Sequence, residues 1–297
     1  MKYESSFKSE ADNLEISIMA VIPDKKPYRA VVQLVHGMSE HKERYLPFMQ
    51  YLAKSGYVTV IHDHRGHGKS VKYQDDLGFT YGGGAQAMLQ DIRTVNRKIH
   101  AYYPELPLIL MGHSMGSLAV RAFVAEHDSC ADMLIVCGSP SYNTAMPLGV
   151  AIAKTEKAVF GPRHRSKLIE TMSFGAGAMK FRKDKRCTAW ICSDPDVAKE
   201  YEESEMCGFT FKDDAYLALF ELMKRAYDVE HFSCTNPDMP VLFVSGAEDP
   251  CLINVRHFAK TVRAMRHAGY KDVKGKLYPG MRHEILNEIG KEQVYHD

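Results

Sequence analysis

The sequence predicts an α/β protein with a mostly parallel, doubly wound sheet and an inserted, mainly helical subdomain. Short, nearly continuous apolar runs recur along the chain, and such runs are typical of strands buried on both faces of a parallel sheet. Between most of these runs, apolar residues recur at three and four positions, which indicates helices. Because strands and helices alternate, we expect helices on both faces of the sheet.

The expected elements follow from these patterns in chain order. Apolar and polar residues alternate over residues 14–22, which is typical of an antiparallel strand. The buried strands are expected at residues 30–35, 57–61, 108–111, 133–137 and 241–244, with a further strand leaving the sheet from Lys276. The helices between them are expected at residues 44–54, 85–102 and 115–126.

The alternation stops after Ser139-Pro140 and resumes at Pro240. A plain connection of this length is uncommon in a compact domain, so the segment predicts an inserted cap subdomain. The expected division is residues 1–140 for the first part of the core, 141–234 for the cap and 235–297 for the second part of the core.

Composition excludes several classes of protein. Thirty-eight Lys and Arg residues face thirty-seven Asp and Glu residues, so no overall field attracts the chain to nucleic acid, and no nucleic-acid partner is expected. The seven cysteines are scattered and form no C-x-x-C pair, a pattern typical of reduced thiols. The first residues lack the apolar stretch of a signal peptide. We therefore expect a cytoplasmic protein.

The sharpest motif is Gly112-His113-Ser114-Met115-Gly116, placed between an expected strand and an expected helix. A serine in G-x-S-x-G needs this setting, because the tight turn tolerates only small residues on either side and lifts the hydroxyl clear of the backbone. Ser114 is therefore the candidate nucleophile.

A serine nucleophile needs a histidine base and a carboxylate that orients the base, in the chain order Ser, acid, His. Asp249 follows the expected strand at 241–244, and His283 follows the strand that leaves the sheet from Lys276. An aspartate in a turn and a histidine at a helix start are common by themselves. Taken together, Ser114, Asp249 and His283 predict a catalytic triad at one edge of the sheet.

Cleavage of an ester also needs donors for the oxyanion, and backbone amides serve well because they are fixed before the reaction begins. The amide of Met115, directly after the nucleophile, is one expected donor. The amide of Met38, in the glycine turn that follows the strand at 30–35, is the other.

Taken together, these motifs resemble those of the α/β-hydrolase superfamily, in the branch of monoacylglycerol lipases and lysophospholipase-like serine esterases. The matching segments are His36-Gly37-Met38-Ser39-Glu40-His41 with Arg44-Tyr45, Asp63-His64-Arg65-Gly66-His67-Gly68-Lys69-Ser70, Gly112-His113-Ser114-Met115-Gly116, Gly246-Ala247-Glu248-Asp249 and Gly280-Met281-Arg282-His283-Glu284. Two positions depart from the pattern: Met38 stands where a smaller residue is commoner, and Ser117 where a third glycine is usual.

The resemblance implies an α/β-hydrolase fold, the triad Ser114, Asp249 and His283, an oxyanion hole from the amides of Met38 and Met115, and no cofactor or metal. It implies a carboxylic ester hydrolase that acts on a small-molecule acyl ester of lipid type, a monoacylglycerol or a lysophospholipid, through an acyl-enzyme. The cap matches well-known lipases poorly, so acyl length and head group stay open, as does the oligomeric state.

Several alternatives remain open at this point. A peptidase of the prolyl-iminopeptidase type, an acyltransferase and a thioesterase could share the triad, and a relative without activity could act as a ligand-binding protein. The segment His62-Asp63-His64-Arg65-Gly66-His67 resembles a metal-hydrolase motif, but a glycine replaces a required aspartate. The apolar residues of 145–160 could line an acyl tunnel or touch a membrane surface transiently, although packing onto the core is the default.

Overall fold

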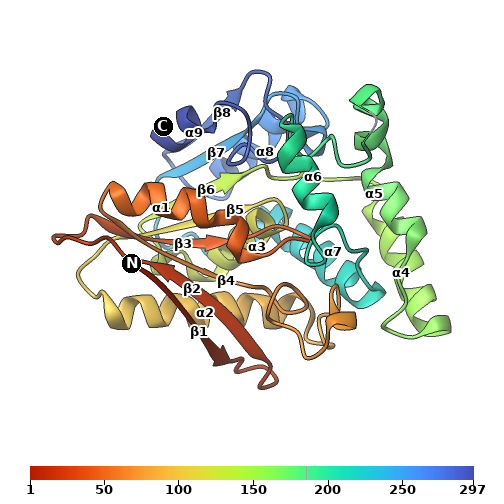
Figure 1. Ribbon diagram of the computed structural model, residues 1–297, viewed down its shortest axis with the longest axis horizontal. Helices are drawn as coiled ribbons and strands as arrows, with labels where there is room; N and C mark the ends of the chain where they lie inside the picture. The colour runs from red at the N-terminus through yellow and green to blue at the C-terminus, as the bar shows by residue number, and fades with distance from the viewer. Residues whose placement is uncertain (185) are drawn as a thin grey trace.

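The computed structural model describes residues 1–184 and 186–297; Lys185, one of the basic residues of the expected cap, lies outside the described residues. One eight-stranded sheet runs through the described chain in the order β1-β2-β4-β3-β5-β6-β7-β8 (Figure 1). The strands are β1 (Lys2–Lys8), β2 (Glu15–Val21), β3 (Ala30–Val35), β4 (Tyr57–His62), β5 (Leu108–His113), β6 (Met133–Cys137), β7 (Val241–Gly246) and β8 (Val273–Tyr278).

The six strands from β3 to β8 are parallel to one another, while β1 pairs antiparallel with β2, and β2 antiparallel with β4, at one edge. All the expected strands are present, and the predicted doubly wound, mostly parallel sheet is confirmed. Strand β1 was not expected from the sequence. Only Phe7 of its seven residues is buried, so its sequence carries no apolar signal.

Apolar residues on alternate positions of the strands pack into two layers. On β3, Val31 and Val35 belong to one layer, and Val32 and Leu34 to the other. The first layer packs against α2 (Gly84–Tyr102), α3 (Met115–His127), α7 (Asp213–Tyr227) and α8 (Val255–His267). The second packs against α1 (Leu46–Lys54) and α9 (Lys291–His296). The carboxyl ends of the parallel strands therefore form one edge between two helical layers.

Between β6 and β7, the described residues form four α-helices: α4 (Met146–Phe160), α5 (Lys167–Lys180), α6 (Pro195–Glu203) and α7. Helix α7 packs against α3 and α4. Helices α4 and α5 lie far from both chain termini, at the right of Figure 1. The division into core and cap at 141–234 stays a prediction. In the ranges 1–184 and 186–297, no helix is both long and apolar enough to cross a membrane.

Candidate active site

Ser114 lies in the turn between β5 and α3, with a positive φ of 53°. Its N–H donates to the carbonyl oxygen of Cys137 at 3.0 Å, which fixes this turn against β6. A Cβ on Gly116 would collide with the carbonyl oxygen of Val35, and one on Gly112 with the backbone of Gly116. The turn therefore needs glycine at both positions, and it presents the serine hydroxyl at the edge of the sheet.

The three predicted triad residues lie together at the carboxyl ends of β5, β7 and β8. Nε2 of His283 lies 2.8 Å from Oγ of Ser114, and Nδ1 of His283 lies 2.9 Å from Oδ2 of Asp249. The same Oδ2 accepts the hydroxyl of Ser245 at 2.9 Å, and Oδ1 accepts the N–H of Cys251 at 2.8 Å. These two donors hold the carboxylate facing the imidazole.

The site is buried, and the charges of the pair oppose the effect of burial on both groups. Burial lowers the pKa of His283, but the charge of Asp249 and its hydrogen bond outweigh burial, and the pKa is raised above its ordinary value. Burial raises the pKa of Asp249, but His283 and the donors around it outweigh that effect, and the pKa is lowered. The pair therefore favours an ionised carboxylate beside a basic imidazole.

The two expected oxyanion donors, the amides of Met38 and Met115, both belong to residues beside the candidate nucleophile in sequence or in space. Met115 is the first residue of α3, where a backbone N–H has no partner within the helix. Gly37 passes so close that a Cβ on it would lie 3.1 Å from Cβ of Ser114. Met38 follows it and lines the same cavity as Ser114. The geometry can serve an oxyanion between the two amides, and their role stays a prediction.

A cavity of about 400 Å³ opens above Ser114 and His283. Aromatic side chains from the chain between β6 and β7 line much of its wall: Phe174, Trp190, Tyr201 and Phe209. The ring of Trp190 lies 5.3 Å from that of His283, and Phe174 stacks on Trp190 at 5.5 Å. An apolar cavity of this size can hold a small acyl ligand.

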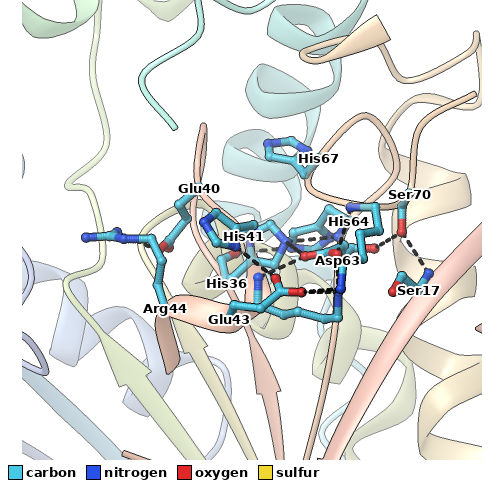
Figure 2. A network of polar contacts seen from close by, with 12 residues as sticks. Ser17, His36, Glu40, His41, Glu43, Arg44, Asp63, His64, His67 and Ser70 are labelled. Carbon is cyan, nitrogen blue, oxygen red and sulfur yellow. Dashed lines mark hydrogen bonds and ion pairs between the residues drawn. The ribbon is translucent and has the colours of Figure 1, made fainter. Parts of the chain in front are cut away.

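A buried carboxylate, Glu40, connects the turn of Gly37 with β5, the strand that leads to the candidate nucleophile. Oε1 of Glu40 accepts the N–H of Gly37 at 2.6 Å and the hydroxyl of Tyr45 at 2.9 Å. Nδ1 of His113, the residue before the nucleophile, lies 3.4 Å from the same oxygen. The other oxygen, Oε2, accepts Nη1 of Arg44 at 3.0 Å. Figure 2 shows Glu40 and Arg44 beside the histidines of this region.

Arg44 also binds the residue next to the candidate base. Its two terminal nitrogens donate to the two carboxylate oxygens of Glu284 at 2.6 and 2.7 Å. The guanidinium lies over the ring of Tyr201 on α6, 5.0 Å from its centroid. Sequence reasoning assigned no role to Glu40, Arg44 or Glu284. Their sequence positions were the only indication of a role: Glu40 and Arg44 follow the glycine turn at Gly37, and Glu284 directly follows the candidate base.

In the loop 62–67, which resembles a metal-hydrolase motif in sequence, the carboxylate of Asp63 binds lysine and backbone donors. Asp63, labelled in Figure 2, is the acceptor of three hydrogen bonds. It accepts one from Nζ of Lys42 at 2.6 Å, one from the N–H of Lys42 at 2.8 Å and one from the N–H of Lys69 at 2.9 Å. Among the described residues, the groups of side chains that could share a metal ion are Asp249, Cys251 and His283, and Glu156, His164 and Asp213. The first group is explained by the triad geometry.

The parallel sheet, the strained serine turn and the Ser–His–Asp arrangement at its edge define an α/β-hydrolase. The chain belongs to the family described as serine aminopeptidase S33, Hydrolase_4, which it matches over residues 26–290. The predicted superfamily and its lipase and lysophospholipase branch are confirmed.

Similar proteins are named as lipases and esterases. A monoacylglycerol lipase of Mycolicibacterium smegmatis is 28% identical over 278 residues, covering 93% of this chain and 88% of the relative. Phospholipase YtpA of Bacillus subtilis is 25% identical over 130 residues, covering 44% of this chain and 48% of the relative. A thermostable carboxyl esterase from Bacillus coagulans, solved with glycerol, has a TM-score of 0.91 at 26% identity. The match covers 99% of this chain and 96% of the esterase chain. The predicted enzyme class, a carboxylic ester hydrolase, is confirmed.

Proposed function

We propose that this protein hydrolyses monoacylglycerol-type lipid esters, with Ser114 as nucleophile, His283 as general base and Asp249 as the group that orients the base. The observation that carries the proposal is the continuous path of 2.8 and 2.9 Å contacts from Ser114 through His283 to Asp249, beneath an aromatic-lined cavity. Imidazole within 2.8 Å of the hydroxyl is within proton-transfer reach.

In the proposed reaction, the hydroxyl of Ser114 attacks the acyl carbonyl while Nε2 of His283 takes its proton. The amides of Met38 and Met115 donate to the oxyanion, and the imidazolium then protonates the leaving alcohol. Water, deprotonated by the same imidazole, releases the fatty acid from Ser114. Asp249 keeps Nδ1 protonated and stabilises the imidazolium without itself taking the proton.

The charges around the cavity favour a neutral head group over a phosphate. Glu170 and Glu284 line the cavity, while none of its described lining residues is Lys or Arg. Three basic residues of the neighbouring segment pair elsewhere: Arg163 with Asp76, Arg165 with Asp75 and Arg186 with Glu202. Glu284 is already paired with Arg44, so Glu170 is the carboxylate that decides between the head groups. A glycerol head offers hydroxyl donors to this carboxylate, whereas the carboxylate would repel a phosphate, so we favour monoacylglycerol over lysophospholipid.

The surface of the cap supports contact with a lipid phase, from which such substrates come. Large apolar side chains of α4 and α5 are more than one third exposed: Leu148, Val159, Phe160, Leu168, Met172 and Met179. Apolar side chains of this kind bind membrane interfaces by burial of their surface. We propose that the cap touches lipid surfaces transiently. The seven cysteines are free in the described structure and support a cytoplasmic location.

The test is a panel of substrates with one acyl chain and different head groups: a monoacylglycerol, a lysophosphatidic acid and a lysophosphatidylcholine. We expect fastest turnover of the monoacylglycerol and a loss of roughly 10⁴-fold or more in kcat for Ser114→Ala. Ser55→Ala is the matched control, since this serine only caps the end of α1. Equal turnover by Ser114→Ala and the wild type would overturn the proposal.

The family description favours one further candidate, a serine aminopeptidase. Glu170 in the cavity could pair with the free amino group of a peptide as well as with glycerol. The panel therefore includes proline p-nitroanilide. Faster turnover of this compound than of every ester would favour the aminopeptidase and reject the lipase.

A further inference from the structure

A second cluster of ionisable side chains lies away from the triad, where α4, the turn after it and α7 meet. Glu156 lies on α4, His164 in the turn between α4 and α5, and Asp213 at the start of α7. Nδ1 of His164 lies 3.1 Å from Oδ2 of Asp213 and 4.0 Å from Oε2 of Glu156. Each residue offers one ligand atom within 4.8 Å of the others. In Figure 1, α4 and α7 are neighbouring helices, and they pack together.

Two carboxylate oxygens in this cluster lack a hydrogen-bond partner among the described residues. The side chain of Asp213 is fully buried, with 0% exposed, and its Oδ1 has no donor there. Oε2 of Glu156 is also a buried atom without a donor. Buried carboxylate oxygens in folded proteins are normally satisfied, because an unpaired one forfeits its hydration. Nδ1 of His164 faces Asp213, and a neutral imidazole carries only one N–H, so this ring cannot satisfy both carboxylates.

The nearby basic side chains are committed to other carboxylates. Lys157, next to Glu156 on α4, binds Asp214 at 3.1 Å. Arg163 binds Asp76, and Lys212 binds Asp75. Among the described residues, the carboxylates of Glu156 and Asp213 therefore have no ammonium or guanidinium partner. Burial and the charge of Glu156 raise the pKa of Asp213, although His164 acts in the opposite direction.

We propose that Glu156, His164 and Asp213 bind a divalent transition-metal cation of the Zn²⁺ or Mn²⁺ type. Two carboxylate oxygens and one imidazole nitrogen are a ligand set that these ions accept, whereas Ca²⁺ and Mg²⁺ prefer oxygen alone. Ligands at about 2.0–2.2 Å from Zn²⁺ lie roughly 3–3.5 Å from one another, so side-chain rotation from the present arrangement brings them into place. A water molecule completes the coordination.

The cation would act as a structural clamp and not as part of the ester chemistry. It would tie α4 and the turn that leads into α5 to α7, which is packed on α3 of the core. Helix α5 carries Glu170 and Phe174 of the active-site cavity. The proposed site is thus placed to fix the position of the cavity wall, and its existence does not depend on the proposed substrate.

The test uses the full chain after dialysis against EDTA, titrated with ZnCl₂, MnCl₂ and CaCl₂ by isothermal calorimetry, with Tm measured in parallel. We expect one Zn²⁺ or Mn²⁺ per chain, a higher Tm on loading, and weaker binding of Ca²⁺. Glu156→Gln keeps the size of the side chain, and we expect it to weaken binding by roughly 10-fold or more, since loss of even an outer-shell partner costs 10–100-fold. Asp213→Asn should do the same if it folds.

The matched control is His231→Gln, which removes an exposed histidine 2.7 Å from one carboxylate, Asp228, without a second carboxylate. We expect its Zn²⁺ affinity to equal that of the wild type. An unchanged affinity of Glu156→Gln for Zn²⁺ would overturn the proposal. So would the absence of stoichiometric binding to the wild type, and a bridging water would then be the partner of the two carboxylates. If Glu156→Gln still binds Zn²⁺ with full affinity and the bound ion abolishes ester turnover, the ion lies at Asp249, Cys251 and His283. This result would also overturn the proposal.

Discussion

Oε1 of Glu40 accepts the backbone N–H of Gly37 at 2.6 Å, and both residues are buried. Burial raises the pKa of Glu40, but His113 and Arg44 outweigh that effect, and the pKa lies well below its ordinary value. The carboxylate is thus an ionised, fixed acceptor for the turn that carries Met38. An ionised acceptor forms a stronger hydrogen bond than a neutral one, so Glu40 sets the position of this turn.

Glu40→Gln should therefore lower kcat while leaving KM nearly unchanged. Misplacement of an oxyanion donor reduces transition-state stabilisation, and we expect a loss of roughly 10- to 100-fold in kcat, less than complete removal of a donor costs. Glu43→Gln is the matched control, because Glu43 binds His41 and Lys42 and makes no contact with Gly37. Steady-state kinetics with one p-nitrophenyl ester checks both. An equal loss in the two variants would contradict the role of Glu40.

Breaking the ion pair of Arg44 and Glu284 should destabilise the fold strongly. Their side chains are only 8% and 6% exposed, so removal of one partner leaves a buried charge. For Arg44→Met, we expect a decrease in the free energy of unfolding of about 3–5 kcal/mol, measured by urea denaturation. Arg186→Gln, which breaks a half-buried pair with Glu202, should cost less than about 1 kcal/mol. Similar losses in both variants would contradict this prediction.

The sequence predicts the sheet well, because strands buried on both faces leave continuous apolar runs. Strands β3 and β6 begin and end where their runs do. All residues of the edge strand β1 except Phe7 are exposed, so no apolar pattern marks it. Helices α4 to α7 were expected only as a helical region, since burial in α5, for example, depends on contacts that its own sequence does not specify.

The candidate triad could be predicted because each residue follows a recognisable strand, and parallel strands bring their carboxyl ends to one edge. The pairing of Arg44 with Glu284 could not, because 240 positions separate the two residues and a charged side chain predicts exposure. The cluster of Glu156, His164 and Asp213 could not be predicted from the sequence for the same reason. Its residues come from two helices and a turn, and only tertiary packing brings them together.

Buried histidines around Asp63 should make the fold sensitive to acid. Burial lowers the pKa of His62 and of His67 to about 4, below the ordinary 6.5. Each must be neutral in the folded chain, so its contribution is fully present above pH 6.5 and is lost as pH falls toward about 4. The loss is about 3 kcal/mol for each histidine, from 1.36 kcal/mol per pKa unit.

His62→Phe isolates this effect, because both ring nitrogens of His62 lack a hydrogen-bond partner among the described residues. Replacement by an apolar ring removes the protonation cost without breaking a hydrogen bond. We expect the free energy of unfolding of His62→Phe to exceed that of the wild type by a margin that grows as pH falls from 6.5 toward 4. A margin independent of pH would rule out His62 as a source of acid sensitivity.

The pH dependence of ester turnover should depend on the contact between His283 and Asp249. The proposed base acts as neutral imidazole, so kcat/KM should fall as pH drops through the pKa of His283, which lies above the ordinary 6.5. Asp249→Asn removes the charge that raises this pKa while burial still lowers it, so the acidic limb should move to lower pH. The rate should also fall by roughly 10⁴-fold, because the amide favours the wrong tautomer of His283.

The control is Glu248→Gln, since Glu248 is next to Asp249 in sequence but exposed. It should leave both the acidic limb and the rate unchanged. The profile is measured with a p-nitrophenyl ester, and an acidic limb at the same pH in Asp249→Asn would show that another group controls it.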